Sequence, residues 1–201
     1  MIINFKNKNN LFAKIKIKLD KLWTLSILKI QFYKIGKKVV IQSPRYIYNS
    51  PSIQIDNNVT IGPNCRIEAY NIDGLNNPSL IISEGASIQH GVHIYSAGKL
   101  IIERDCLIAS GCMITDNNHG KSPVSGPYSG QSLEARATYI GRNVWLGENV
   151  AVLAGSNIGD NSIIGANSVV TGTIPENSIA AGIPARVIKK YDFILNKWIK
   201  S

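Results

Sequence analysis

The sequence has few of the features that mark a secreted, membrane-spanning or disordered protein. Its three cysteines form no Cys-x-x-Cys pair, which argues against a disulfide framework and a structural zinc site. No stretch approaches the ~20 apolar residues of a membrane span, and the N-terminus lacks an apolar core followed by a small-residue cleavage site. Charged residues make up only 17% of the chain against 44% hydrophobic residues, which excludes disorder for most of it. We therefore expect a folded, cytoplasmic protein of one domain within these 201 residues.

The net charge of +9 is confined to one part of the chain. Residues 1–38 contain ten lysines and a single acid, Asp20, whereas the remaining 163 residues hold 12 basic and 12 acidic side chains. A nucleic-acid-binding domain would spread its basic residues over the folded surface. We therefore expect no nucleic-acid partner, and the basic arm and the neutral body need separate explanations.

The body is a repeat of six residues. An aliphatic residue recurs every six positions, and a small or compact residue follows four positions later. The aliphatic positions are Ile55, Ile61, Ile67, Ile82, Ile88, Ile94, Ile102, Ile108, Ile114, Ile140, Leu146, Val152, Ile158, Ile164 and Val170. Because residues two apart in an extended strand share one side, both columns point inward. Cys65, Cys106 and Cys112 fall in the small column, so we interpret them as buried fillers rather than reactive thiols.

Glycine, asparagine and aspartate follow many of the aliphatic positions, and these residues tolerate tight corners between short strands. Three hexads to a coil predict a triangular β-solenoid of about five coils. Its longest interruption lies between Ile114 and Ile140, where nine of the thirteen residues from Gly120 to Ser132 are Gly, Pro or Ser. A long loop inside a compact repeat is more often functional than idle.

The stretch from Ile140 to Lys190 is IGRNVWLGENVAVLAGSNIGDNSIIGANSVVTGTIPENSIAAGIPARVIKK. It resembles the hexapeptide-repeat acyltransferases, of the sugar O-acetyltransferase type that includes capsule, lipopolysaccharide, maltose and galactoside acetyltransferases. The resemblance covers about residues 53–190. It implies a mainly β fold, a left-handed parallel β-helix, with acetyl-CoA as co-substrate.

His119 is the candidate catalytic base, because it follows Asp116 where the long loop leaves the regular edge. A neutral imidazole can accept a proton from a hydroxyl as that hydroxyl attacks a thioester. The resemblance places the family's general-base histidine here. Asp116 either orients the imidazole or forms an Asx turn at the start of the loop. His93 is a candidate for lining the sugar site.

His90, His93 and His119 match in number the metal ligands of the gamma-class carbonic anhydrases, a related β-helix. Their spacing does not match that pattern, so we expect no metal.

Trp145 precedes the inward Leu146, so alternation turns its indole outward, where a ligand or a partner chain would cover it. The resemblance places this tryptophan beside the acyl-donor cleft, with backbone amides near Trp145 or Gly147 holding the oxyanion. The donor contacts that the resemblance implies fall on Trp145, Gly147, Glu148, Ala166, Thr171, Gly172, Arg186 and Lys189. Many relatives carry a small residue in place of Glu148 and a lysine in place of Gly172. This site has therefore gained a carboxylate and lost a cation.

The expected organisation is a basic, helical N-terminal arm over residues 1–50, a β-helix domain over 51–185 and a C-terminal segment over 186–201 with a short helix. A protruding loop spans about 119–139. We favour the arm as a cap on the first coil, with a peripheral contact to the anionic inner face of the membrane as the alternative.

The function we expect is acetyl transfer from acetyl-CoA to a sugar hydroxyl, in capsule or O-antigen modification, by a homotrimer with sites between subunits. N-acetylation of an amino sugar nucleotide and a non-enzymatic assembly module are the alternatives.

Overall fold

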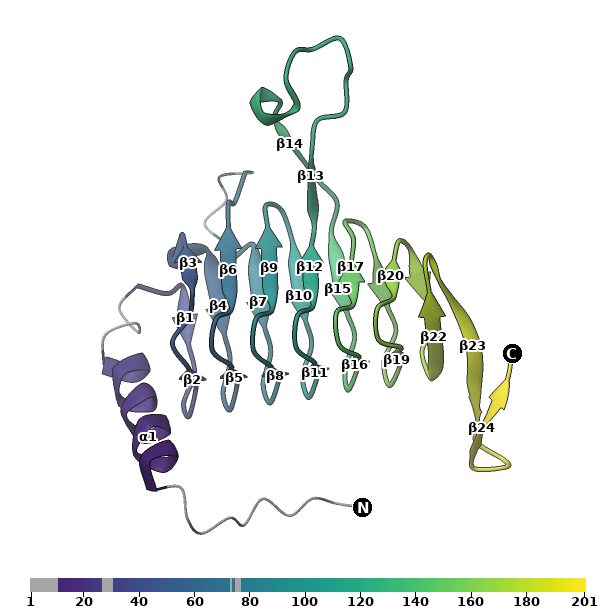
Figure 1. Cartoon of the computed structure of the whole chain (residues 1–201), viewed down its shortest axis with the longest axis horizontal. Helices are drawn as coiled ribbons and strands as arrows, with labels where there is room; N and C mark the ends of the chain where they lie inside the picture. Colours follow the sequence, from purple (N-terminus) through teal and green to yellow (C-terminus); the bar gives the residue numbers. More distant parts are fainter. Residues whose placement is uncertain (1–10, 27–30, 73, 75–76) are drawn as a thin grey trace.

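A computed structural model describes residues 11–26, 31–72, 74 and 77–201 of the chain. These residues form a prism of stacked coils with one helix at its N-terminal end and one long hairpin projecting from an edge (Figure 1). The first ten residues of the basic arm lie outside the described part.

Three parallel sheets form the sides of the prism, and each coil contributes one strand to each sheet. Sheet A contains β1 (Lys34–Ile35), β4 (Ile53–Ile55), β7 (Leu80–Ile82), β10 (Leu100–Ile102), β15 (Thr138–Ile140), β18 (Asn157–Ile158) and β21 (Thr173–Ile174). Sheet B contains β2 (Val40–Ile41), β5 (Thr60–Ile61), β8 (Ser87–Ile88), β11 (Leu107–Ile108), β16 (Trp145–Leu146), β19 (Ile163–Ile164), β22 (Ser178–Gly182), β23 (Ala185–Asp192) and β24 (Lys197–Lys200). Sheet C contains β3 (Tyr46–Tyr48), β6 (Arg66–Ala69), β9 (His93–Ser96), β12 (Met113–Thr115), β17 (Ala151–Val152) and β20 (Val169–Val170).

The six-residue period places its aliphatic residues in the core, as predicted. All fifteen are at most 1% exposed, and equivalent positions stack from coil to coil, as Ile67, Ile94 and Ile114 do in sheet C. The three cysteines are also buried, and each thiol donates a hydrogen bond to a carbonyl of the next coil, 3.0 to 3.1 Å away. Burial raises the pKa of Cys106 to about 12 and that of Cys112 to about 11. The three cysteines are buried fillers of the core, as expected.

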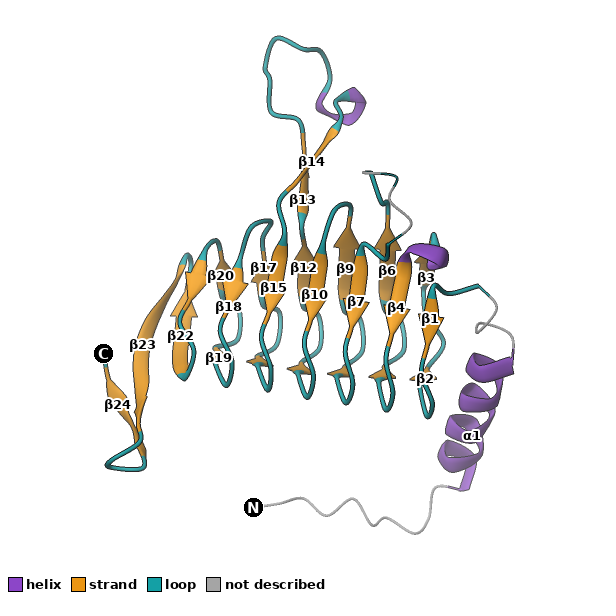
Figure 2. Cartoon of the chain, turned by 180° about the vertical axis from the view of Figure 1, so that it is seen from behind, coloured by secondary structure: helices purple, strands orange, loops and turns teal. Residues whose placement is uncertain are grey.

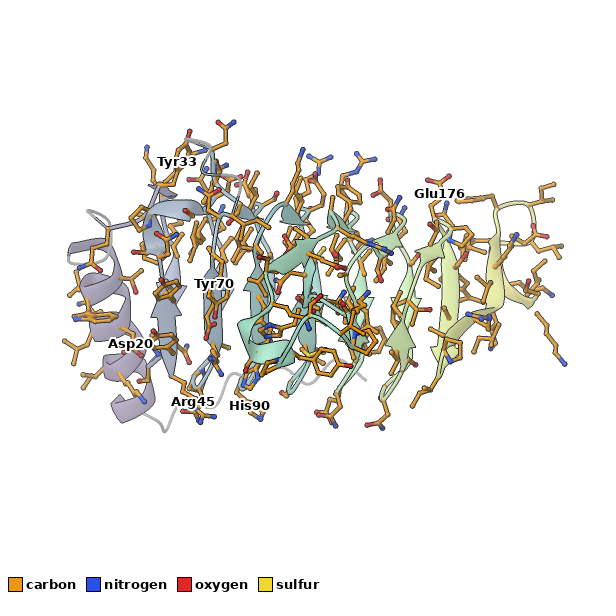
Figure 3. All side chains as sticks on the ribbon, turned by 90° about the horizontal axis from the view of Figure 1, so that it is seen from above. Asp20, Tyr33, Arg45, Tyr70, His90 and Glu176 are labelled. Atoms are coloured by element: carbon orange, nitrogen blue, oxygen red, sulfur yellow. The ribbon has the colours of Figure 1, made fainter. Side chains whose placement is uncertain are left out.

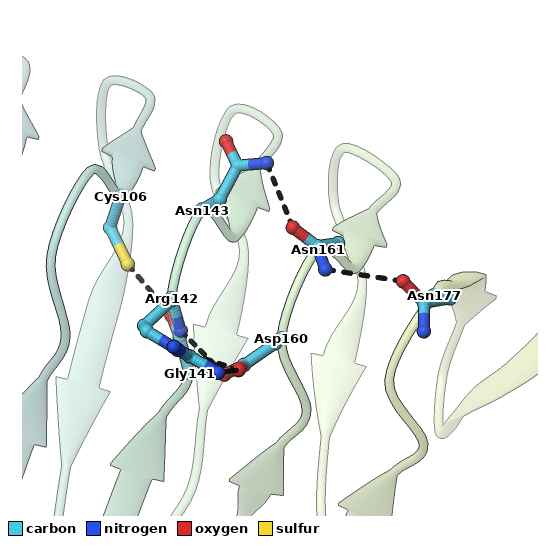
Figure 4. A network of polar contacts seen from close by, with 7 residues as sticks. All are labelled: Cys106, Gly141, Arg142, Asn143, Asp160, Asn161 and Asn177. Carbon is cyan, nitrogen blue, oxygen red and sulfur yellow. Dashed lines mark hydrogen bonds and ion pairs between the residues drawn. The ribbon is translucent and has the colours of Figure 1, made fainter.

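Asparagines form a ladder along the corner between sheets A and B (Figure 4). The Asn143 amide donates to Asn161, and Asn161 donates to Asn177, at 3.0 and 3.2 Å. All three residues have φ between 53° and 58°, a left-handed conformation that asparagine tolerates better than most side chains.

Asp160 and Arg142 form an ion pair beside the ladder. Burial would raise the pKa of Asp160, but the hydrogen bonds and charge of Arg142 outweigh this effect and leave the pKa below its ordinary value.

The solenoid begins one coil earlier than expected. Strands β1, β2 and β3 form a coil within residues 34–48, which the sequence interpretation assigned to the arm. Sheet C has one strand for every complete coil, so the described chain contains six complete coils and the prediction of about five was one too few. The first coil also obeys the repeat, because Ile35, Ile41 and Ile47 are six residues apart.

The C-terminal segment is a hairpin, so the predicted short helix was wrong. Strand β23 pairs antiparallel with β22, and β24 pairs antiparallel with β23. The outer edge of β22 would leave backbone N–H and C=O groups without hydrogen bonds. The chain that follows pairs with these groups as strand β23, which a helix could not do.

Helix α1 (Leu11–Ser26) packs against β2 at the N-terminal end of the prism. The C-terminal hairpin of β23 and β24 lies at the opposite end (Figure 2). The Thr24 hydroxyl accepts a 3.2 Å hydrogen bond from the Ile41 amide and donates to the Asp20 carbonyl at 2.7 Å. The expected helical arm is therefore present over these residues, and it is docked on the first coil. Among the described residues, no helix is long and apolar enough to cross a bilayer.

Candidate active site

The Gly-, Pro- and Ser-rich segment after Ile114 forms a protruding hairpin. Strands β13 (Asn117–His119) and β14 (Leu133–Ala135) pair antiparallel, and His119 lies opposite Leu133. A short 3-10 turn, Tyr128–Gly130, lies near the tip. The Gln131 side chain bonds the backbone N–H and C=O of Ser122, at 3.1 and 2.8 Å, so internal hydrogen bonds hold the loop in shape.

Asp116 anchors the base of this hairpin. Its buried carboxylate accepts hydrogen bonds from the amides of Ala97 and Gly98, at 2.7 and 3.1 Å, and from the Ser96 hydroxyl at 3.0 Å. A fourth bond comes from the neighbouring Asn117 side chain at 3.0 Å. These bonds tie the start of β13 to the preceding coil.

His119 is exposed at the end of β13 and lines a cavity of about 710 Å³. The hairpin forms one wall, and the outward side chains of sheet C form the floor. Besides His119, the lining includes Arg66, Glu68, Tyr70, Tyr95, Met113, Thr115, Gln131, Leu133 and Leu153. The cavity therefore offers hydroxyl, amide and charged groups around an accessible imidazole.

The other two histidines have different surroundings. His93 does not line the cavity, but its Nδ1 lies 3.3 Å from the hydroxyl of Tyr95, which does. His90 lies in the turn after β8, where its Nδ1 is 3.0 Å from the Ser110 hydroxyl. No group of three or more His, Cys, Asp or Glu within the described part of the chain is placed to hold a metal ion.

Trp145 lies on another face of the prism. It is 48% exposed on β16, in sheet B, and lines a separate cavity of about 510 Å³ together with Tyr191, Phe193 and Trp198 of the C-terminal hairpin. A single chain thus places Trp145 and His119 in two different cavities.

The predicted donor residues divide between the two edges of sheet C and the final hairpin. Gly147 and Glu148 lie at the edge shared with sheet B, and Ala166 lies one coil further along it. A side chain at Gly147 would approach the Ala166 amide nitrogen to 2.6 Å, so close stacking of the coils requires glycine there.

Thr171 and Gly172 lie at the opposite edge of sheet C, where the His119 hairpin leaves two coils earlier. Arg186 and Lys189 are exposed on β23.

The backbone amides of Trp145 and Gly147 themselves are already engaged in hydrogen bonds. The Trp145 amide donates to the Ser162 carbonyl at 3.0 Å, and the Gly147 amide donates to the Ile164 carbonyl at 2.8 Å. Both bonds belong to the ladder between coils, so neither amide is free to hold a developing oxyanion. The oxyanion donor therefore stays a prediction, and it would have to be another amide near Trp145 or Gly147.

Sequence reasoning missed four residues of the cavity floor. Arg66 and Glu68 flank the inward Ile67, and Tyr95 follows the inward Ile94, so strand alternation turns all three outward on sheet C. Tyr70 comes directly after β6. The signal was available in the repeat, because the residues that flank the third aliphatic position of each coil face the side where the loop emerges.

The chain matches the family model described as bacterial transferase hexapeptide (six repeats) over residues 137–172. It is 42% identical over 169 residues to a protein of Escherichia coli (strain K12) named as a lipopolysaccharide biosynthesis O-acetyl transferase, covering 81% of this chain and 84% of the relative. The chain belongs to the hexapeptide-repeat acetyltransferases.

Two further members of the family are similar over large parts of the chain. The galactoside O-acetyltransferase of E. coli (strain K12) is 34% identical over 137 residues, covering 65% of this chain and 63% of the relative. The structure of a hexapeptide-repeat acetyltransferase from Vibrio cholerae O1 biovar eltor, complexed with acetyl coenzyme A, has a TM-score of 0.62 at 19% identity, covering 90% of this chain and 82% of that one. The second likeness is one of fold.

Proposed function

We propose that the protein transfers an acetyl group from acetyl-CoA to a sugar hydroxyl of a surface polysaccharide, either capsule or O-antigen. The observation that carries this proposal is the exposed His119 in a 710 Å³ cavity whose lining combines hydroxyl, amide and charged side chains with apolar ones. The relatives named for lipopolysaccharide and galactoside O-acetylation support the sugar acceptor. The acetyl-CoA complex of the structural relative supports the donor.

In this reaction His119 is the catalytic residue. A ring nitrogen of the neutral imidazole takes the proton of the acceptor hydroxyl as its oxygen forms a bond to the carbonyl carbon of the thioester. The carbon–sulfur bond then breaks, CoA leaves as the thiolate, and the imidazolium returns its proton to that sulfur. Asp116 is a positioning residue, because its bonds to Ala97 and Gly98 fix the strand that carries His119.

The donor lies along the C-terminal coils in this proposal. Its pantetheine arm runs beside Gly147, Ala166 and Gly172, in the left-handed β-helix that the family shares. The exposed Arg186 and Lys189 meet its phosphates, for which cations are suited. Glu148 and Thr171 border the same path.

We further propose a homotrimer in which His119 of one chain faces Trp145 of the next. The two residues line separate cavities in one chain, so a site that uses both needs two chains. Cyclic symmetry would give three identical sites of this kind.

Helix α1 gives the protein a peripheral membrane contact at the cytoplasmic face in this proposal. Ile15, Leu19, Leu22 and Trp23 form an i, i+4, i+7, i+8 stripe, and each is 42% to 59% exposed. Exposed lysines at positions 16 and 18 lie nearby. An exposed apolar stripe with basic neighbours suits anionic lipid.

The test is acetyl transfer by the purified protein, followed through released CoA with a thiol reagent, over panels of sugars and amino sugars. The expected result is turnover with a hydroxyl acceptor, giving a product whose acetyl group is removed by mild base. A base-stable product formed only with amino sugars would show N-acetylation instead. The absence of turnover with all acceptors would favour the non-enzymatic assembly module.

A further inference from the structure

The outward side of sheet C carries two columns of large side chains that run away from His119 toward the N-terminal coils. Tyr46, Arg66, His93 and Met113 are register partners on successive coils, and so are Tyr48, Glu68, Tyr95 and Thr115. Met113 and Thr115 line the His119 cavity. The columns therefore connect this cavity to the first coil.

Tyrosine rings at the far end of these columns form a row of neighbouring rings. The Tyr46 and Tyr48 rings are stacked, 6.3 Å apart and 16° from parallel, and the Tyr48 and Tyr70 rings are 5.4 Å apart. The Arg66 guanidinium lies 5.9 Å from the Tyr46 ring and 5.4 Å from the Tyr95 ring. The rings hold one another in place although Tyr46, Tyr48 and Tyr70 are 48%, 44% and 41% exposed. In the view from the loop side, Tyr70 lies between α1 and the hairpin (Figure 3).

The charges in this row compensate each other. The buried Glu68 carboxylate accepts hydrogen bonds from the Arg66 Nε and from the Tyr70 hydroxyl. The bond to Glu68, with burial, raises the pKa of Tyr70 to about 12, so this phenol stays protonated at neutral pH. An arginine already paired with a carboxylate suits a neutral, hydroxyl-rich ligand better than a phosphate.

The His119 cavity and a neighbouring cavity together make up a groove along these columns. A second cavity of about 390 Å³, lined by Arg45, Tyr46 and Arg66, adjoins the His119 cavity through their shared Arg66. From Met113 to Tyr46 there are three strand steps, or about 14 Å at the usual spacing. Exposed tyrosine rings beside a groove with both polar and apolar lining are suited to the apolar C–H faces of consecutive pyranose rings.

We propose that the acceptor is a glycan chain of several sugars that lies along this groove. The acetylated sugar is held below His119, and the sugars next to it stack on Tyr70, Tyr48 and Tyr46. This inference rests on the proposed sugar O-acetylation and adds the size class of the acceptor.

The test compares acceptors of different length on single variants. The probes are a size ladder of oligosaccharides from partial hydrolysis of the source organism's surface polysaccharide, freed of acetyl groups with mild base, and the monosaccharides from its complete hydrolysis. We expect Tyr46→Ala and Tyr48→Ala each to raise KM for the longer oligosaccharides by about tenfold, with kcat and all monosaccharide parameters unchanged. Tyr46→Phe and Tyr48→Phe should retain tight binding, because they keep the ring.

Tyr33→Ala is the matched control, since Tyr33 is 50% exposed and directly precedes β1 of sheet A, whereas Tyr46 and Tyr48 lie on sheet C. It should leave every parameter unchanged. Equal effects on short and long acceptors, or no effect of the alanine variants, would overturn the proposal. A lower mass for Tyr46→Ala in sedimentation would overturn it too, because the row would then be a contact with a second copy.

Calorimetric titration of the oligosaccharides, without acetyl-CoA, separates this inference from the proposed function. Length-dependent binding that the alanine variants weaken would support the groove even if no acetyl transfer occurred. Acetylation of sugars without any dependence on their length would support the acetyltransferase activity and contradict binding of a glycan chain in the groove.

Discussion

The three histidines occupy three distinct settings, in a turn, on strand β9 and at the end of strand β13. His119 lines the large cavity, His93 contacts a lining tyrosine, and His90 lies in a turn beside Ser110. Because all three side chains are imidazoles, we attribute different effects of their alanine variants to where each histidine lies.

Replacing His119 with alanine should lower kcat by about 10²- to 10⁴-fold, the usual contribution of a general base, with acetyl-CoA affinity unchanged. His93→Ala should mainly raise the acceptor KM, because His93 supports Tyr95. Steady-state kinetics with both substrates checks these outcomes, and His90→Ala is the control with near-normal values. Near-normal turnover of the His119 variant would place the base elsewhere.

The buried thiol of Cys106 should make the free energy of unfolding depend on pH in the alkaline range. Its thiol is 1% exposed and its pKa is raised by burial from 9.0 to about 12, so the folded chain keeps a proton that the unfolded chain releases. The contribution of this thiol is complete below pH 9.0 and is lost as the pH rises toward about 12, with a slope of up to about 1.4 kcal/mol per pH unit.

Urea unfolding between pH 7 and pH 11 tests this linkage. Cys106→Ala should lose stability less steeply than the natural chain above pH 9, because lysines and tyrosines titrate equally in both. Parallel curves for the two proteins would contradict it.

At the scale of elements, helix α1 has two sides that can be tested separately. Leu19→Glu with Leu22→Glu changes only exposed positions, so it should abolish binding to phosphatidylglycerol vesicles and leave the melting temperature unchanged. Thr24→Ala removes the acceptor of the Ile41 amide, so it should lower the melting temperature and leave vesicle binding intact.

Vesicle co-sedimentation at two salt concentrations and thermal unfolding are the measurements. Binding by the natural chain should weaken as salt rises, since lysines near a charged surface are screened. If the natural chain does not bind anionic vesicles, α1 is a cap alone.

Elements formed by interactions between residues close in the sequence could be predicted, and elements formed by pairing with distant segments could not. The six-residue period predicted all fifteen aliphatic core positions from Ile55 to Val170, because each hexad repeats the same local environment. The coil around Ile41 was missed because Lys34, Lys37 and Lys38 give it the charge of the arm. The C-terminal hairpin could not be predicted locally, since its partner strand β22 supplies the reason for it.

The site shows the same limit. His119 was predicted from the break that the long loop makes in the repeat. The floor of its cavity comes from β6 and β9, up to about fifty residues earlier in the chain, and stacking of coils brings these strands together. The pairing of Arg66 with Glu68, two residues apart on one strand, was readable from alternation alone.

At the scale of the whole molecule, the proposed trimer makes a prediction that a monomeric enzyme would not. His119→Ala and Trp145→Ala should each lower activity, and refolding equal amounts together should restore it in about one quarter of the sites if each site takes its two residues from neighbouring chains. Activity after mixing, with each variant refolded alone as the control, is the measurement. An unrestored mixture, or a fully active monomer in sedimentation, would contradict the shared site.

A parallel solenoid is open-ended, because its last coil offers the same backbone pattern as every coil before it. Here both ends depart from that pattern. At the C-terminal end, strand β23 runs antiparallel to β22, so another copy cannot continue the parallel stack of sheet B. At the N-terminal end, the Ile41 amide already donates a hydrogen bond to the Thr24 hydroxyl. Both features disfavour filament growth along the prism axis, so the proposed trimer would have to form through the lateral faces of the prism, as a closed assembly of limited size.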